Sequence, residues 1–218
     1  KPSQPVQRSQ WLVSSRAISF GALLVVQKTG GANLRGPPSS DTTSMADISI
    51  APGDRGLERA LSKALEGEVR FDRFTRGLYS SDASHYQIEP IGVVFPRSVD
   101  DVVATLELAR DRGVPVLPRG GGTSQCGQTV GRAIVIDTNR YLTSVGSVVR
   151  TGDTAEIEVE SGVVLDRLNH SVKDQGLWFP VDPSTASRAT LGGMAGNNSA
   201  GARSIQYGMM ADNVSAIE

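Results

Sequence analysis

The first regular pattern of apolar positions in the chain lies between residues 57 and 65. Apolar residues fall there at the spacings i, i+3, i+4, i+7 and i+8: Leu57, Ala60, Leu61, Ala64 and Leu65. On an α-helix these spacings place all of the side chains on one side. The pattern therefore predicts an amphipathic helix, which Gly67 would end.

A strand, a helix and two further strands are predicted from residue 92 to residue 137. Gly92–Phe95, 114–117 and 133–137 are short apolar runs, as expected for buried strands. Ser98 is a candidate N-cap for the helix between the first two runs, and Gly113 would end that helix. An apolar stripe on it is expected to face the core: Val99, Val102, Val103, Leu106 and Ala109. The order strand, helix, strand predicts a βαβ unit with parallel strands.

The second half of the chain is less regular. Residues 155–160 alternate between apolar and polar, which predicts a half-exposed strand. A helix that ends near Gly176 is predicted from the apolar residues Val164, Leu165, Leu168 and Val172. Residues 190–207 are rich in Gly, Ala and Asn, and we assign no element to them. Residues 214–218 have the pattern of a strand that begins there.

The charged residues are distributed unevenly along the chain. Residues 1–40 contain five basic residues and no acidic residue, whereas the rest contains 17 basic and 23 acidic residues. Residues 1–44 are polar and have no sustained period, so we expect a disordered leader or sequence upstream of a start at Met45. A mitochondrial transit peptide is the alternative. The cellular location stays open between the cytoplasm, the membrane periphery and, with a transit peptide, the mitochondrion.

The overall composition argues against several classes of protein. A net charge of -1 argues against a nucleic-acid partner. The single cysteine, Cys126, excludes an internal disulfide and a zinc site made of cysteines alone, and no metal site is predicted. The longest apolar run, 17–26, is too short to span a bilayer. The 24 glycines, against only 5% aromatic residues, indicate a backbone that must approach something closely.

The first of two glycine clusters directly follows the predicted strand at 114–117. Residues 118–124 read Pro-Arg-Gly-Gly-Gly-Thr-Ser. Successive glycines allow the backbone to present several N–H groups to a phosphate or pyrophosphate. Arg119 would supply a counter-charge, and Thr123 and Ser124 would add hydroxyl donors. The spacing does not match the dinucleotide fingerprint, and Gln128 stands where a P-loop has its lysine. The alternative interpretation is a flexible loop that binds no ligand.

The second glycine cluster extends from residue 191 to residue 201. Small residues occupy nearly every position, so another surface or a flat ligand can approach closely. Asn197 and Asn198 carry amides that can both donate and accept hydrogen bonds. Taken together, the first cluster suits a charged phosphate linker and the second suits a planar polar ring.

These motifs resemble the FAD-binding domain of the vanillyl-alcohol oxidase / p-cresol methylhydroxylase flavoprotein superfamily. The similarity is closest to the glycolate oxidase / D-lactate dehydrogenase branch, which contains FAD-linked 2-hydroxy-acid dehydrogenases. It covers residues 66–218 and is carried by the motifs at 118–124, 182–184, 189–193, 197–201, 207–208 and 212–214.

The resemblance implies an α+β fold with two α/β subdomains and FAD between them. A βαβ parallel subdomain is expected at 68–140, after an N-terminal helical region at 45–67. A mixed or antiparallel subdomain is expected at 141–218, incomplete at its C-terminus. The chain would then be the N-terminal fragment of a larger flavoprotein.

The resemblance also implies which residues bind the cofactor. Residues 119–124 would wrap the FAD pyrophosphate through backbone N–H groups. Residues 183–184 and 190–193 would line the flavin and ribityl region, and Asn197, Asn198 and Gly201 would lie near the isoalloxazine and the pyrophosphate. The expected set is Arg119, Gly120, Gly121, Gly122, Thr123, Ser124, Pro183, Ser184, Thr190, Gly192, Gly193, Asn197, Asn198 and Gly201. Some relatives attach flavin covalently through a His in the first loop. This loop has no His, so FAD is expected to bind non-covalently.

The activity implied by the resemblance is oxidation of a 2-hydroxy acid, such as D-lactate or glycolate, by hydride transfer to flavin. In the family the catalytic base and the substrate-binding residues come from later segments, so no catalytic residue is assigned here, and the electron acceptor is unknown. An iron–sulfur cluster would require a cysteine-rich C-terminal extension. The alternatives are an FAD-binding module that is inactive without a separate catalytic domain, or an alcohol oxidase of the same fold.

Overall fold

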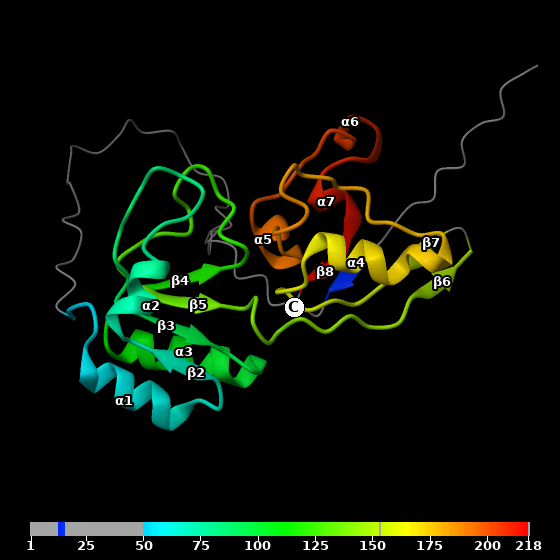
Figure 1. Ribbon diagram of the computed structural model, residues 1–218. Coiled ribbons are helices and arrows are strands. Elements are labelled where there is room, and N and C mark those ends of the chain that lie inside the picture. The colour runs from blue at the N-terminus through cyan, green and yellow to red at the C-terminus, as the bar shows by residue number, and fades with distance from the viewer. Residues whose placement is uncertain (1–12, 16–49, 153, 218) are drawn as a thin grey trace, which may run out of the picture.

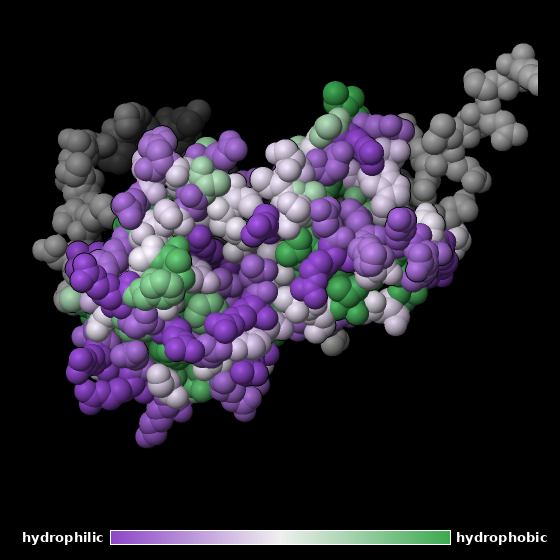
Figure 2. All heavy atoms as spheres, viewed as in Figure 1, coloured by the Kyte–Doolittle hydropathy of each residue, from purple (hydrophilic) through white to green (hydrophobic). Residues whose placement is uncertain are grey.

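The described residues of the computed structural model, 13–15, 50–152 and 154–217, form two lobes (Figures 1 and 2). The first lobe contains α1 to α3 and a four-stranded sheet. The second lobe contains α4 to α7 and several short strands. Each lobe has its own hydrophobic core, so the described chain has the α+β, two-part organisation expected from the sequence.

The sheet of the first lobe has the strand order β2-β3-β5-β4. Its strands, in chain order, are β2 (Glu68–Arg70), β3 (Gly92–Phe95), β4 (Val116–Arg119) and β5 (Ile134–Asp137). β3, β5 and β4 run parallel, as predicted, but β5 lies between the two strands that α3 connects. β2 pairs antiparallel with β3. The sequence did not predict β2, because its three residues contain a single apolar side chain.

Helices α1 (Arg55–Ala64) and α3 (Val99–Asp111) cover one face of this sheet (Figure 1). Leu57 and Leu61 of α1 are fully buried there against Val94 and Ile134. The opposite face presents Val93, Phe95 and Val135. On that side Tyr79, which follows α2 (Arg73–Leu78), packs with its ring edge-on to Phe95.

Helix α3 has the predicted bounds and cap, but the stripe predicted to face the core is partly wrong. Ser98 caps the helix by accepting a hydrogen bond from the Asp101 N–H. Val99 and Val103 are 47% and 43% exposed, whereas Asp101 and Thr105 are buried. The buried face of α3 therefore differs from the predicted one. The Asp101 carboxylate explains the difference, because it accepts hydrogen bonds from the backbone N–H groups of Glu66, after α1, and Arg97, before α3.

The second lobe is built around α4 (Leu165–Val172), which continues into the 3₁₀ turn η1 (Lys173–Gln175). Gly176 ends it with a positive φ of 70°, as the sequence predicted. Leu165, Leu168 and Phe179 are at the centre of the core of this lobe. The strand expected at 155–160 is shorter than predicted: β7 covers Thr154–Glu156 and pairs antiparallel with β6 (Val149–Thr151).

The Gly-rich segment at 190–207 contains short helices that the sequence did not predict. They are α5 (Leu191–Gly196) and α6 (Ser204–Tyr207), followed by α7 (Met210–Asn213). Glycine is a poor helix former, so composition argued against α5, but Thr190 caps its first turn. The predicted final strand is β8 (Val214–Ile217), and it pairs in parallel with β1 (Val13–Ser15). The rest of the expected leader lies outside the described residues.

No helix in the described part of the chain combines the length and the apolar character needed to cross a membrane.

Candidate functional site

The first glycine cluster forms the loop that leaves the C-terminal end of β4. At its start the loop packs directly against the second lobe. A Cβ on Gly120 would overlap the Thr190 hydroxyl, and a Cβ on Gly121 would overlap the Arg188 carbonyl oxygen. Glycine is therefore required at both positions by the close approach of the two lobes. The structure thus brings the beginning of the first glycine cluster against residues 188–190, which directly precede the second cluster.

The backbone N–H groups of the first part of this loop have no acceptor among the described residues. From residue 120 to residue 125, none of the consecutive N–H groups donates a hydrogen bond to another described residue. Gly122 has a positive φ of 64°, which turns the backbone within this run. Successive free N–H groups in a turning backbone form a concave site for an anion. The loop therefore offers the kind of donors that a pyrophosphate needs.

Two polar side chains of the loop, Arg119 and Ser124, contact the backbone of this chain. The Arg119 guanidinium donates hydrogen bonds to the backbone carbonyls of Ser81 at 2.8 Å and Thr129 at 3.1 Å. Ser124 Oγ accepts hydrogen bonds from the N–H groups of Cys126 and Gln128, at 3.4 and 3.3 Å. The contacts of Arg119 and Ser124 hold the loop in shape, while the backbone N–H groups of residues 120–125 have no acceptor among the described residues.

Thr190 and the start of the second cluster are tightly packed. Thr190 is 1% exposed, and its hydroxyl accepts a hydrogen bond from the Gly193 N–H at the start of α5. Gly192 is buried against Ser161, and a Cβ on it would lie 2.6 Å from the Ser161 Cβ. Gly193 is exposed. Of these predicted site residues, Gly193 is therefore the one that presents backbone at the surface.

The two predicted asparagines lie just after α5 and are exposed. Asn198 has a positive φ of 45°, and its Oδ1 accepts a hydrogen bond from the Ala211 N–H at 2.9 Å. The Asn197 amide donates to Ser199 Oγ at 3.3 Å. Asn198 therefore fixes the course of the chain toward α7, a role that the sequence did not indicate.

Pro183 and Ser184 belong to a segment that packs against the end of the second cluster. Gly201 lies directly against the Asp182 carbonyl, leaving no room for a Cβ. The Asp182 carboxylate accepts a hydrogen bond from the Arg203 N–H at 3.0 Å and pairs with its guanidinium at 3.4 Å. The motifs at 182–184 and 197–201, separate in sequence, are therefore adjacent in the second lobe.

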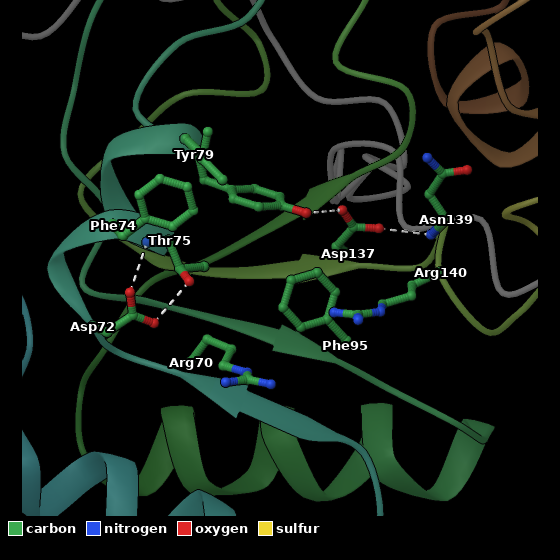
Figure 3. A pocket seen from close by; sticks show the side chains of 10 residues that line it. Arg70, Asp72, Phe74, Thr75, Tyr79, Phe95, Asp137, Asn139 and Arg140 are labelled. Atoms are coloured by element: carbon green, nitrogen blue, oxygen red, sulfur yellow. Dashed lines mark hydrogen bonds between the residues drawn. The ribbon is translucent and has the colours of Figure 1, made fainter.

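A separate pocket of about 590 Å³ lies on the sheet face opposite α1 and α3 (Figure 3). None of the predicted cofactor-binding residues lines it. Its wall is formed by Arg70, Asp72, Phe74, Thr75, Leu78, Tyr79, Phe95, Asp137, Asn139 and Arg140. The sequence did not predict this pocket, because its residues come from α2 and its flanks, from three strands and from the segment after β5, which only the fold brings together.

Tyr79 and Asp137 form the most buried polar contact of this pocket. The Tyr79 hydroxyl donates to Asp137 Oδ2 at 2.6 Å, and the other carboxylate oxygen accepts from the Asn139 N–H at 2.7 Å (Figure 3). Burial raises the pKa of the Asp137 carboxyl and also raises the pKa of the Tyr79 hydroxyl. Asp137 ends β5 directly beside Arg119, which ends β4, so this contact lies next to the glycine loop.

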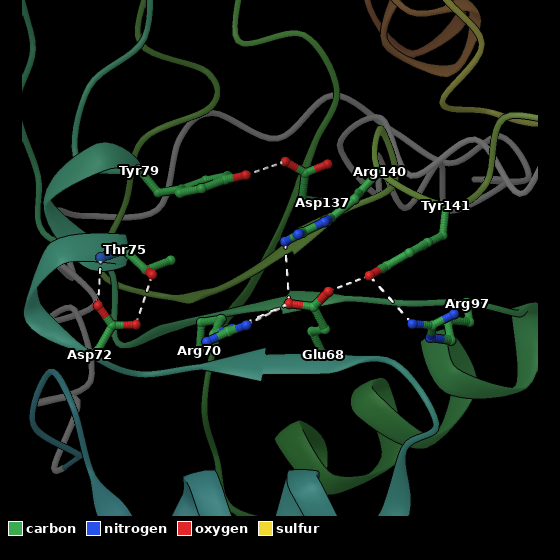
Figure 4. A network of polar contacts seen from close by, with 9 residues as sticks. All are labelled: Glu68, Arg70, Asp72, Thr75, Tyr79, Arg97, Asp137, Arg140 and Tyr141. Carbon is green, nitrogen blue, oxygen red and sulfur yellow. Dashed lines mark hydrogen bonds and ion pairs between the residues drawn. The ribbon is translucent and has the colours of Figure 1, made fainter.

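Glu68 is the centre of an ionic network beside the pocket (Figure 4). Its carboxylate pairs with Arg70 at 2.9 Å and Arg140 at 3.2 Å, and it accepts a hydrogen bond from the Tyr141 hydroxyl. The hydrogen bonds from Tyr141 and Arg70 lower the pKa of Glu68. Both arginine side chains are about half exposed, so these ion pairs lie at the solvent-exposed surface and are not a buried charge cluster.

Comparison with known proteins identifies the family. The sequence profile described as "FAD binding domain" matches residues 90–218. The chain belongs to this family. The resemblance to the vanillyl-alcohol oxidase / p-cresol methylhydroxylase fold and the expected cofactor, FAD, are thereby confirmed.

Two curated relatives show the breadth of the similarity. D-2-hydroxyglutarate dehydrogenase of Escherichia coli is 36% identical over 175 residues, which are 77% of this chain and 17% of the relative. Glycolate oxidase subunit GlcD of Bacillus subtilis is 32% identical over 160 residues, 71% of this chain and 33% of the relative. The chain therefore spans a third or less of these relatives.

A solved structure with a similar fold is alkyldihydroxyacetonephosphate synthase. It has a TM-score of 0.63 and 25% identity, over 73% of this chain and 33% of that one. The fold described above is therefore shared with about a third of that larger protein.

Proposed function

We propose that this chain binds FAD non-covalently where its two lobes meet, with the pyrophosphate on the backbone of residues 120–125. The run of free N–H groups carries this proposal, since it lies where Gly120 and Gly121 contact the second lobe. A pyrophosphate carries negative charge on several oxygens and can accept a hydrogen bond from each of several such donors.

The other predicted residues are assigned to the flavin side of the site. Gly193, Asn197, Asn198 and Ser184 are exposed on the second lobe and are available to a ligand. Thr190 and Gly192 are buried, so they shape the wall beneath the ligand and do not contact it through side chains. The loop at 119–124 contains no His, which supports non-covalent binding.

We further propose that the chain is the flavin-binding part of an enzyme that oxidises a 2-hydroxy acid. The names of the relatives support this class, with 2-hydroxyglutarate, lactate and glycolate as candidate substrates. Bound FAD would accept the hydride from the substrate carbon that carries the hydroxyl. The chain's own part is to bind and orient the cofactor. We assign neither the catalytic base nor the electron acceptor to a residue or partner.

Binding of FAD to the purified chain tests the first proposal. The chain is mixed with FAD, freed of excess ligand, and its visible spectrum is recorded. We expect retained flavin absorption, and much weaker retention of FMN, which lacks the pyrophosphate and the adenosine. ADP should compete with FAD. A chain that retains no FAD, or that binds FMN as well as FAD, would contradict the assignment of the loop.

Anaerobic addition of each candidate substrate to the FAD-loaded chain tests whether it can act alone. We expect the flavin spectrum to persist, because no substrate-binding residue is assigned within the chain. The same substrates should bleach the flavin of a complete enzyme that contains this domain. If none of the three acids bleaches the complete enzyme, the substrate class is wrong even where FAD binds.

A further inference from the structure

The glycine loop, here residues 119–129, is held in place by the segment that follows α2. Residues 79–84 lie against residues 119–129, and the two loops rise side by side above β4 in Figure 1. The Ala83 N–H donates to the Gly122 carbonyl at 3.1 Å. Asp82 Oδ2 accepts from the Thr129 hydroxyl at 2.9 Å. The loop is thus attached to residues 82 and 83 at two points, Gly122 and Thr129.

Arg119 makes the third and most extensive attachment. Nη2 donates to the Ser81 carbonyl at 2.8 Å, while Nη1 donates to the Thr129 carbonyl at 3.1 Å and the Tyr79 carbonyl at 3.4 Å. Three backbone carbonyls from both loops therefore share one guanidinium. Gly122 leaves the space for it, since a Cβ there would lie 2.7 Å from Nη2.

An aromatic ring and a buried carboxylate complete the arrangement. The Arg119 guanidinium carbon lies 5.0 Å from the centre of the Tyr79 ring, within the range of a cation–π contact. The hydroxyl of the same ring is held by Asp137, which is 6% exposed. Asp137 thereby fixes the ring on which Arg119 rests.

We propose that Arg119 is a positioning residue, which holds the glycine loop in its ligand-binding shape through contacts to backbone carbonyls, and not a counter-ion of the bound pyrophosphate. The inference deepens the proposed function and rests on it for the identity of the ligand. A planar guanidinium has five N–H donors in a fixed fork and can satisfy carbonyls from several segments at once. A lysine ammonium has the same charge at a single atom and cannot reproduce that geometry.

The two roles predict opposite results for a substitution that keeps the charge. Arg119→Lys and Arg119→Gln are compared with the native chain by FAD titration at low and high salt. If Arg119 positions the loop, both variants should weaken FAD binding to a similar extent, roughly tenfold or more. The salt dependence of binding should stay native in both, because no ligand contact by a charge has been lost. Arg132→Lys and Arg132→Gln are matched controls, because Arg132 is an exposed arginine in the same connection.

Two results would overturn the proposal. Native affinity in Arg119→Lys, combined with weak and less salt-dependent binding in Arg119→Gln, would identify Arg119 as a counter-ion. Native affinity in both variants would show that the guanidinium does not matter to the loop. Added guanidinium ion should restore binding in an Arg119→Ala variant if the lost contacts are those to the carbonyls, and lack of rescue would count against it.

A ligand-free measurement separates this proposal from the identity of the cofactor. Amide hydrogen exchange of residues 119–129 is compared between the native chain and Arg119→Lys without FAD. We expect faster exchange confined to this loop and to residues 79–84, with unchanged exchange in α4 and α5. Unchanged exchange in the loop would refute the positioning role even if FAD binds. Failure of the native chain to bind FAD, with faster loop exchange in the variant, would refute the proposed function alone.

Discussion

Gly121 lies so close to the carbonyl oxygen of Arg188 that a Cβ on the glycine would overlap it. The two residues belong to different lobes and are 67 positions apart in the sequence. Both sides of this contact are backbone, which cannot turn away as a flexible side chain can. The contact therefore fixes how closely the two lobes approach at the proposed pyrophosphate site.

Gly121→Ala is expected to push the lobes apart and to weaken FAD binding. Overpacking of this kind costs about 1–3 kcal/mol of stability. Thermal unfolding and FAD titration measure the two effects. Gly131→Ala is the matched control, because its added Cβ would lie 3.4 Å from a leucine side chain, an ordinary contact distance. Native FAD affinity in Gly121→Ala would show that the contact does not define the site.

Thr190→Val is expected to destabilise the second lobe at the start of α5. The change keeps the shape of the buried side chain but removes the acceptor for the Gly193 N–H. Loss of a helix N-cap costs about 1 kcal/mol. Urea denaturation measures this loss, and Thr190→Ser should recover most of it because the hydroxyl is restored. Equal stability of the Val variant and the native chain would contradict the capping role.

Asp101→Asn is expected to destabilise the first lobe. Each oxygen of the buried carboxylate accepts a backbone N–H, from Glu66 and from Arg97, both at 2.8 Å. An amide has one acceptor oxygen, so one N–H would lose its partner and face an NH₂ group. An unsatisfied buried group costs about 1–3 kcal/mol. Denaturation by urea measures this cost, and Asp100→Asn, at the exposed neighbouring position, should change stability little.

Asp137 should give the stability of the chain a pH dependence of predictable sign. Burial raises the pKa of its carboxyl above the ordinary value of 3.8, so the folded chain binds this proton more tightly than the unfolded chain. The free energy of unfolding therefore falls as the pH rises from 3.8 through the raised pKa. In Asp137→Asn this contribution is absent. The stability of the variant relative to the native chain should increase over that interval, as measured by urea denaturation at a series of pH values. Parallel pH profiles would show that the folded carboxyl titrates normally.

Glu68 should give the stability of the chain a pH dependence of the opposite sign. Hydrogen bonds from Tyr141 and Arg70 lower its pKa below the ordinary value of 4.5. The stability contributed by the ionised carboxylate is present above that value and is lost as the pH falls through the lowered pKa. Glu68→Gln should flatten this acid limb while lowering the melting temperature at neutral pH only slightly, because the network is exposed to solvent and salt. A large loss at neutral pH would contradict the surface assignment.

Local signals in the sequence predicted much of the fold. The apolar run Gly92–Phe95 matches β3 residue for residue, and Ser98 caps α3 as expected. The face of α3 was partly wrong because Asp101, polar in sequence, is buried by its contacts to two backbone N–H groups. Periodicity alone cannot distinguish a charged residue in solvent from one that is buried with its partners.

The residues assigned to the candidate site stay predictions, but the structure shows what their side chains contact. The resemblance marked Arg119 and Asn198 as cofactor residues, whereas their side chains hold backbone groups of this chain. Tyr79 and Asp137 had no signal in the sequence, since 58 residues separate them and neither belongs to a glycine motif. Only the three-dimensional contact reveals that they support Arg119.

The packing of Gly120 and Gly121 has a practical consequence for anyone who engineers this domain. The second lobe already occupies the space that a side chain at either position would need. The triple-glycine sequence is therefore not a flexible linker that accepts substitutions. A saturation library across residues 120–125 should lose almost every substitution at the first two positions. It should keep many at Gln125, whose side chain is exposed. Redesign of cofactor preference should therefore begin at the rim of this loop and leave its first two residues unchanged.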